Sequence, residues 1–116
     1  MDKAIQKLKD ELKQSEAYAA IIFGSYVRDE DFDDIDVAIF TDESVDRIVR
    51  EVSAVFDIQR FSDLPMYVKH RALKKGELIY CSNEDRFYDE TIRFAREYEY
   101  FRPRYEDYLE GVKSRG

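Results

Sequence analysis

The side chains best suited to chemistry form an acidic run between residues 29 and 36. Six of these eight residues are acids and none is basic, the acids being Asp29, Glu30, Asp31, Asp33, Asp34 and Asp36. Successive side chains of a strand alternate between its faces, so Asp34 and Asp36 share one face at the start of a predicted strand over 35–40. Two carboxylates on one face supply the hard oxygen ligands that Mg²⁺ prefers. We therefore predict a metal site at Asp34 and Asp36, and a solvated loop for the other four acids.

A third carboxylate, Asp57, lies within a second predicted strand over 56–61. Alternation places Phe56 and Ile58 on one face of this strand and Asp57 on the other. If the strand pairs beside 35–40, Asp57 joins Asp34 and Asp36. Three carboxylates can hold two divalent ions, an arrangement used for in-line phosphoryl transfer. The pattern thus predicts a catalytic site, with two Mg²⁺ as cofactor and Asp57 completing the metal site.

A glycine–serine pair before the acids provides residues suited to phosphate binding. Gly24 allows the backbone to approach a ligand closely, and a helix that begins there would direct N–H groups at phosphate oxygens. The hydroxyl of Ser25 can add a hydrogen bond. Arg28 lies one turn further along and is a candidate partner for a phosphate or for the acids. Gly24, Ser25 and Arg28 are therefore the predicted nucleotide-binding residues.

The elements that must position these residues alternate along the chain. Apolar spacing predicts helices over 2–15, 43–55, 63–75 and 84–111, with a short one after Gly24, and strands over 17–23, 35–40, 56–61 and 78–81. Val45, Ile48, Val49 and Val52 are expected on one face of the second long helix, and Pro103 is expected to kink or restart the last. This order predicts an α/β (α+β) domain: a small mixed sheet flanked by helices, with an aromatic C-terminal helix over about 84–112.

Composition restricts the functional classes. The chain has 116 residues, the length of one domain, and a net charge of −7. An acidic surface argues against direct binding of DNA or RNA through phosphate contacts. Residues 29–36 contribute six of the negative charges, which leaves −1 for the remainder. With one cysteine, Cys81, no apolar signal segment and no membrane span, we expect a cytoplasmic protein.

These residues resemble a known superfamily. Gly24-Ser25, followed after eight residues by Asp34-Ile35-Asp36 and later by Asp57, resembles the nucleotidyltransferases that include DNA polymerase β. The short length is similar to its minimal members, the MNT proteins paired with HEPN toxins in prokaryotic toxin–antitoxin operons. Further similar segments extend the resemblance from about residue 20 to 110, namely 23–28, 56–58, 72–80 and 94–103. The sequence departs from the family in having Asp29 where a glycine often follows the arginine. The eight residues between Gly24-Ser25 and Asp34 are also a shorter spacing than is common in the family.

The resemblance implies an activity. Such proteins transfer AMP from ATP to a hydroxyl and release pyrophosphate, and in the toxin–antitoxin pairs the acceptor is a tyrosine of the HEPN toxin. It implies that Asp34, Asp36 and Asp57 bind the metal, that Asp57 assists removal of the acceptor proton, and that Gly24 and Ser25 hold the triphosphate. Two alternatives remain. The chain could neutralise its toxin by binding alone, or it could modify a small molecule of the aminoglycoside type.

The C-terminal region carries a second pattern. Aromatic and other residues recur in alternating steps of four and three, at Phe87, Thr91, Phe94, Tyr98, Phe101, Tyr105, Tyr108 and Val112. This spacing corresponds to a period of 3.5 residues, which is typical of a seam against another helix. The seam could pack on the chain's own domain, or it could bind a partner or a second copy of the chain.

Overall fold

The computed structural model describes the backbone of residues 2–24 and 35–115 and the side chains of residues 3–24 and 35–100. The helices are α1 (Asp2–Lys13), α2 (Asp46–Glu51), α3 (Met66–Lys75) and α4 (Glu84–Arg115), with a short 3-10 helix, η2 (Phe61–Asp63). The strands are β1 (Ala19–Phe23), β2 (Ile35–Phe40), β3 (Phe56–Arg60) and β4 (Glu77–Cys81). None of the helices in these described ranges is long and apolar enough to cross a membrane.

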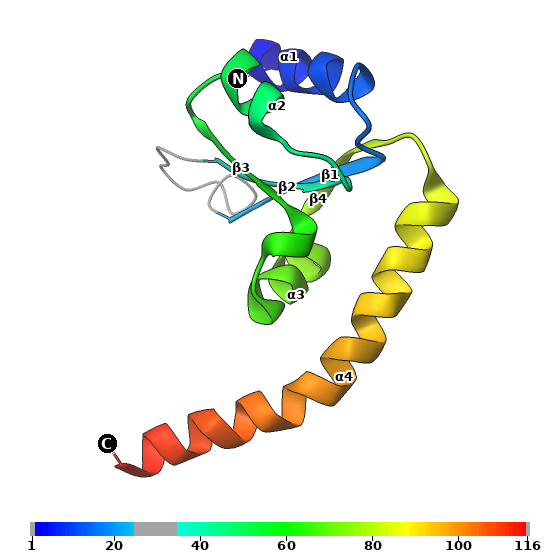
Figure 1. Cartoon of the computed structure of the whole chain (residues 1–116). Coiled ribbons are helices and arrows are strands. Elements are labelled where there is room, and N and C mark those ends of the chain that lie inside the picture. The colour runs from blue at the N-terminus through cyan, green and yellow to red at the C-terminus, as the bar shows by residue number, and fades with distance from the viewer. Residues whose placement is uncertain (1, 25–34, 116) are drawn as a thin grey trace.

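The four strands form one mixed sheet in the order β3-β2-β1-β4. β1 is antiparallel to both β2 and β4, whereas β2 and β3 are parallel. Parallel neighbours cannot be joined by a tight turn, and the connection from β2 to β3 accordingly passes through α2 on one face of the sheet (Figure 1). The predicted mixed sheet with flanking helices is confirmed.

Each face of the sheet is covered by helices because apolar residues occupy both faces of the central strands. Figure 1 shows α1 and α2 on one side of the sheet and α3 and α4 on the other. The first side buries Ile35, Val37 and Ile39 of β2 against Leu8, Leu12 and Ile48. The second buries Ala38 and Phe40 against Phe61, Ala72 and Phe94. Phe40 stacks on Phe61 with 4.3 Å between ring centroids, which fixes η2 at the end of the sheet.

Two predicted helices differ from the structure. The helix predicted over 43–55 is only Asp46–Glu51, because Val52 already has extended backbone angles. The predicted apolar face of this helix is partly wrong, since Ile48 is buried but Val49 is 46% exposed. The third long helix begins at Met66 after Pro65, and Asp63 pairs with Arg60 instead of capping it. The short helix predicted after Gly24 lies outside the described residues.

The last helix is one continuous element. α4 extends from Glu84 to Arg115 without a break at Pro103, so the predicted restart there is wrong. Its first half packs on the sheet through Phe87 and Phe94, where the Phe94 ring lies edge-on to Phe61. Its second half extends away from the sheet and from α3 (Figure 1).

Candidate active site

Two of the three predicted metal-binding carboxylates lie at matched positions on neighbouring strands. Asp36 of β2 and Asp57 of β3 are direct partners in the register of the parallel pair. Paired residues of adjacent strands point to the same face, and neighbouring strands are about 4.8 Å apart. Asp36 is half-buried and Asp57 is exposed, so a ligand can reach both from solvent. The prediction that Asp57 joins Asp36 through strand pairing is therefore consistent with the register.

The face that carries the two acids is fixed by their neighbours. Ile35 and Val37, on either side of Asp36, are buried beneath α1 and α2, as are Phe56 and Ile58 around Asp57. The two carboxylates must therefore leave the sheet on the opposite side, which is the side of α3 and α4. Burial of these apolar neighbours fixes the face of the sheet on which both acids lie, because a register slip of one residue would move every side chain of the strand to the opposite face.

Gly24 lies beside Asp36, one member of this pair. It follows β1 directly and has a φ of +85°, a conformation that side chains disfavour. A Cβ atom placed on Gly24 would lie 2.5 Å from Oδ2 of Asp36, well inside van der Waals contact. Glycine is thus required here for two reasons, and its absent side chain leaves room for the Asp36 carboxylate. The role of Gly24 in nucleotide binding stays a prediction.

The remaining predicted site residues, Ser25, Arg28 and Asp34, lie outside the described residues. Within the described part of the chain, no group of three His, Cys, Asp or Glu side chains is arranged to hold a metal ion. Asp36 and Asp57 provide two carboxylates on one face, and an all-oxygen anionic donor set of this kind fits a hard cation such as Mg²⁺. Asp34, two residues before Asp36, is the predicted source of a third.

A second glycine, Gly76, lies at the same end of the sheet. Its close contacts were not predicted from the sequence. Gly76 ends α3, and a Cβ there would lie 2.3 Å from the carbonyl oxygen of Ala72 and 2.4 Å from Cγ2 of Ile21. The next residue, Glu77, pairs with Ile22 of β1. Gly76 therefore allows α3 to end directly against β1, two residues before Gly24. The sequence signal was limited to a glycine after two lysines, which indicates only a helix end.

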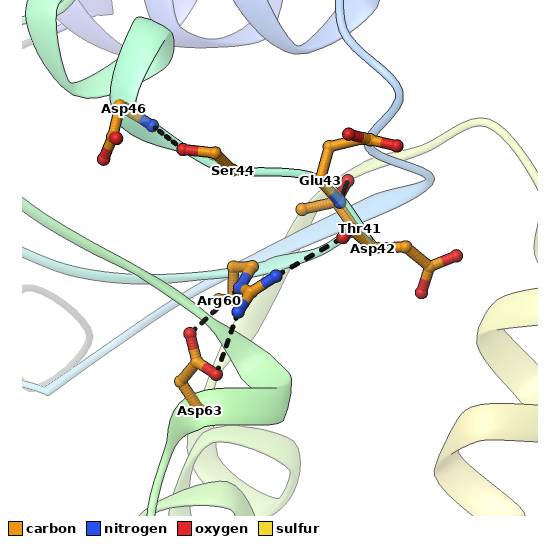
Figure 2. Close-up of polar contacts among 7 residues, drawn as sticks. All are labelled: Thr41, Asp42, Glu43, Ser44, Asp46, Arg60 and Asp63. Atoms are coloured by element: carbon orange, nitrogen blue, oxygen red, sulfur yellow. Dashed lines mark hydrogen bonds and ion pairs between the residues drawn. The ribbon is translucent and has the colours of Figure 1, made fainter.

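A cluster of paired charges occupies the other end of the strands. Arg60 donates from Nε and Nη2 to the carboxylate of Asp63 at 2.9 and 3.2 Å, and from Nη1 to the backbone oxygen of Asp42 at 3.3 Å (Figure 2). The hydrogen bonds that Arg60 donates to Asp63 raise the pKa of Arg60 above its ordinary value. Arg86 pairs with the Asp42 carboxylate and lies over the Tyr18 ring.

This cluster is separate from the carboxylate pair. Asp42 is six residues beyond Asp36, which corresponds to about 20 Å of extended chain. Asp42 borders a pocket of about 300 Å³ that is also lined by Tyr18 and Arg86. Burial raises the pKa of the Tyr18 hydroxyl. Because Arg60 and Arg86 are each paired with an acid, we interpret these contacts as fixing η2 and α4 to the end of the sheet.

Comparison with known proteins identifies the class to which this fold and site belong. Residues 6–85 match the family model described as polymerase beta, nucleotidyltransferase. The match covers more than half of the chain, and the chain belongs to this nucleotidyltransferase family. Comparison with curated proteins finds no match.

Several solved structures to which this chain is similar are toxin–antitoxin complexes. The chain is similar to a chain of the toxin–antitoxin MntA–HepT structure, with a TM-score of 0.74, 10% identity, and 97% and 99% of the two chains covered. It is similar to a chain of a toxin–antitoxin structure with AMP-PNP, with a TM-score of 0.71, 15% identity, and 97% and 98% covered. A third is the tri-AMPylated Shewanella oneidensis HEPN toxin in complex with MNT antitoxin, at a TM-score of 0.68 and 10% identity, with 94% and 98% covered. At these identities the likeness establishes the fold.

Proposed function

We propose that this chain, as one domain over residues 1–116, is a Mg²⁺-dependent adenylyltransferase that acts as an antitoxin in the cytoplasm. The observation that carries the proposal is the register pairing of Asp36 with Asp57, with Gly24 against Asp36, in a chain of the nucleotidyltransferase family. Carboxylates paired on one face beside a glycine turn suit the binding of a metal–nucleotide complex. The substrate proposed is ATP.

Each predicted site residue would have a distinct role in the reaction. Asp34, Asp36 and Asp57 would hold the metal, which when bound neutralises phosphate charge and makes the acceptor hydroxyl more acidic. Gly24 and Ser25 would bind the triphosphate through backbone N–H groups and a hydroxyl, with Arg28 as a further phosphate partner. The acceptor oxygen attacks the α-phosphorus, the bond to the bridging oxygen breaks, pyrophosphate leaves, and the hydroxyl proton passes toward Asp57.

We further propose that the acceptor is a tyrosine hydroxyl of a HEPN toxin. The support is that similarly folded chains occur in complexes with HEPN toxins, one of which is described as tri-AMPylated. A tyrosine that receives AMP gains bulk and negative charge, and such a change can block a site that binds RNA. The partner proposed is therefore protein, with no direct contact to nucleic acid by this chain.

The proposal is tested by incubating the purified chain with α-labelled ATP, Mg²⁺ and its proposed partner, a HEPN toxin. Label should reach a tyrosine of that protein, and Asp36→Asn and Asp57→Asn should each reduce transfer at least a hundredfold. Asp46→Asn on α2, an exposed acid on the other side of the sheet, is the matched control and should leave the rate unchanged. Transfer that survives Asp36→Asn together with Asp57→Asn would refute this assignment.

The same variants separate catalysis from binding. Cells that express the toxin should be rescued by the native chain and not by the Asp36→Asn, Asp57→Asn double variant, provided that both accumulate to the same level. Rescue by the double variant would mean that the chain neutralises its toxin by binding alone. Label on an aminoglycoside in place of the toxin would instead indicate a small-molecule transferase.

A further inference from the structure

An open groove lies between α3, α4 and the edge strand β4. Its volume is about 620 Å³. The walls carry Leu73 and Lys74 from α3, Leu78 from β4, and Phe87, Thr91 and Tyr98 from α4. Leu78 is 46% exposed although it is aliphatic. We refer to this feature as the α3–α4 groove. A groove with apolar side chains and two helical walls is suited to binding a third helix.

The part of α4 that lines the groove is the first half of the aromatic seam. Phe87, Thr91, Phe94 and Tyr98 all border the groove. The same alternation of four and three continues in the second half of the helix at Phe101, Tyr105, Tyr108 and Val112. In the first half, Phe94 is buried against the sheet, whereas Phe87, Thr91 and Tyr98 are half-buried at the groove. The second half projects from the domain (Figure 1).

The seam is complementary to itself when two copies of α4 are antiparallel. Placing Phe87 opposite Val112 also places Thr91 opposite Tyr108, Phe94 opposite Tyr105, and Tyr98 opposite Phe101. All four pairs have the same midpoint, between residues 99 and 100. A twofold axis at that point would match every seam position with another, as a symmetric interface requires.

Charge on the two partners of this arrangement is also complementary. Arg71, Lys74 and Lys75 are exposed residues of α3 spaced three and four apart, so they share one helix face. No acid occurs in Met66–Lys75, and no ion pair between described side chains involves these three cations. Residues 105–112, in contrast, contain three acids and no base, and the two bases of segment 101–112, Arg102 and Arg104, precede them.

We propose that the chain forms a symmetric dimer in which segment 101–112 of each copy occupies the α3–α4 groove of the other. The inference does not depend on the proposed adenylyl transfer, because it uses no residue of the carboxylate site. The second copy supplies a helix whose seam continues the groove's own spacing and whose sequence places three acids on the segment that would enter beside Lys74. A dimer of this kind would present two carboxylate sites in one particle.

Disulfide trapping tests the register. Two full-length chains with different tags, both with Cys81→Ser, would carry Thr91→Cys and Tyr108→Cys respectively, and would be mixed and oxidised. We expect a covalent heterodimer, since the proposed register places these positions opposite each other. The matched control replaces Thr91→Cys by Arg93→Cys, because Arg93 borders the Tyr18–Arg86 pocket and not the groove. The control should link at least tenfold more slowly.

Sedimentation equilibrium tests the charges. The native chain should have twice the mass of one chain, and Arg71→Glu with Lys74→Glu should weaken dimerisation about tenfold. Glu106→Lys with Glu110→Lys should weaken it similarly, and combining the four changes should restore much of the loss. Lys3→Glu with Lys13→Glu, which makes the same charge change on α1, should have no effect. A native chain that is monomeric at 100 μM, on the order of the weakest relevant affinity, or equal linking by Arg93→Cys, would overturn the proposal.

Discussion

Gly24→Ala tests whether the glycine and the Asp36 carboxylate form one tightly packed unit. An alanine at a φ of +85° costs about 1–2 kcal/mol of backbone strain. Its Cβ would start 2.5 Å from Oδ2 of Asp36, and ordinary contact begins near 3.4 Å, so the carboxylate must move by about 0.9 Å. Turning a side chain away from its rotamer costs about 0.5–1.5 kcal/mol. The free energy of unfolding should therefore fall by about 2–3 kcal/mol.

A second background separates the two costs. In Asp36→Ala the oxygen is gone, and the Cβ of residue 36 lies 3.7 Å from the new Cβ, which is ordinary contact. Gly24→Ala should then cost only the backbone strain, about 1–2 kcal/mol. The coupling free energy between the two positions should be about 1 kcal/mol. Urea unfolding at pH 7, followed by circular dichroism for all four chains, measures it.

Two outcomes of this cycle would count against the reasoning. If Gly24→Ala costs the same in both backgrounds, the glycine does not make room for the carboxylate. If it costs less than about 0.5 kcal/mol in both, the residue does not need a positive φ. Mg²⁺ titration of the same chains provides a functional readout, and displacement of Asp36 should weaken metal binding in Gly24→Ala even where the chain remains folded.

Three further predictions concern stability. Ile39→Ala in β2, where the side chain is fully buried, should lower the free energy of unfolding by about 2–5 kcal/mol in urea titrations. Gly76→Ala should also destabilise, because its Cβ would lie 2.3 Å from the Ala72 oxygen, and the melting temperature should fall without a change in Mg²⁺ affinity. The hydrogen bond from Lys7 is the main cause that lowers the pKa of Glu11 below 4.5, so the stability from this contact is present above that pH and is lost as pH falls through the lowered pKa. Glu11→Gln should therefore make unfolding less sensitive to acid below about pH 4.5, as pH-dependent denaturation would show.

The carboxylate pair was predictable because the pattern of apolar residues determines the face of each strand. Ile35, Val37 and Ile39 can be buried together on only one face, which sends Asp36 to the other, and the same holds for Phe56 and Asp57. The pairing of the two strands was a condition in the sequence argument, since alternation specifies a face and not a neighbour. The parallel register supplied by the structure then places the two acids side by side.

Other features do not follow from local sequence patterns alone. Val49 has the spacing of a core residue but is exposed, because α2 is only six residues long and contacts the core through Ile48. Pro103 has the chemistry of a helix breaker, yet α4 continues through it. The contact of Gly76 with Ile21 joins residues 55 positions apart, and its closeness follows from the position of α3 on the sheet.

The parallel pairing of β2 and β3 has a consequence for how the sequence can change. Asp36 and Asp57 are joined by a connection that includes α2, which lies on the side of the sheet opposite the carboxylates, and a turn on either side of α2. Residues could be inserted or deleted in those turns without moving either acid, because the strand register is held by the buried apolar side chains. A single insertion within β2 or β3 would instead turn one acid into the core. The molecule thus tolerates changes of length in its connections but not within these two strands.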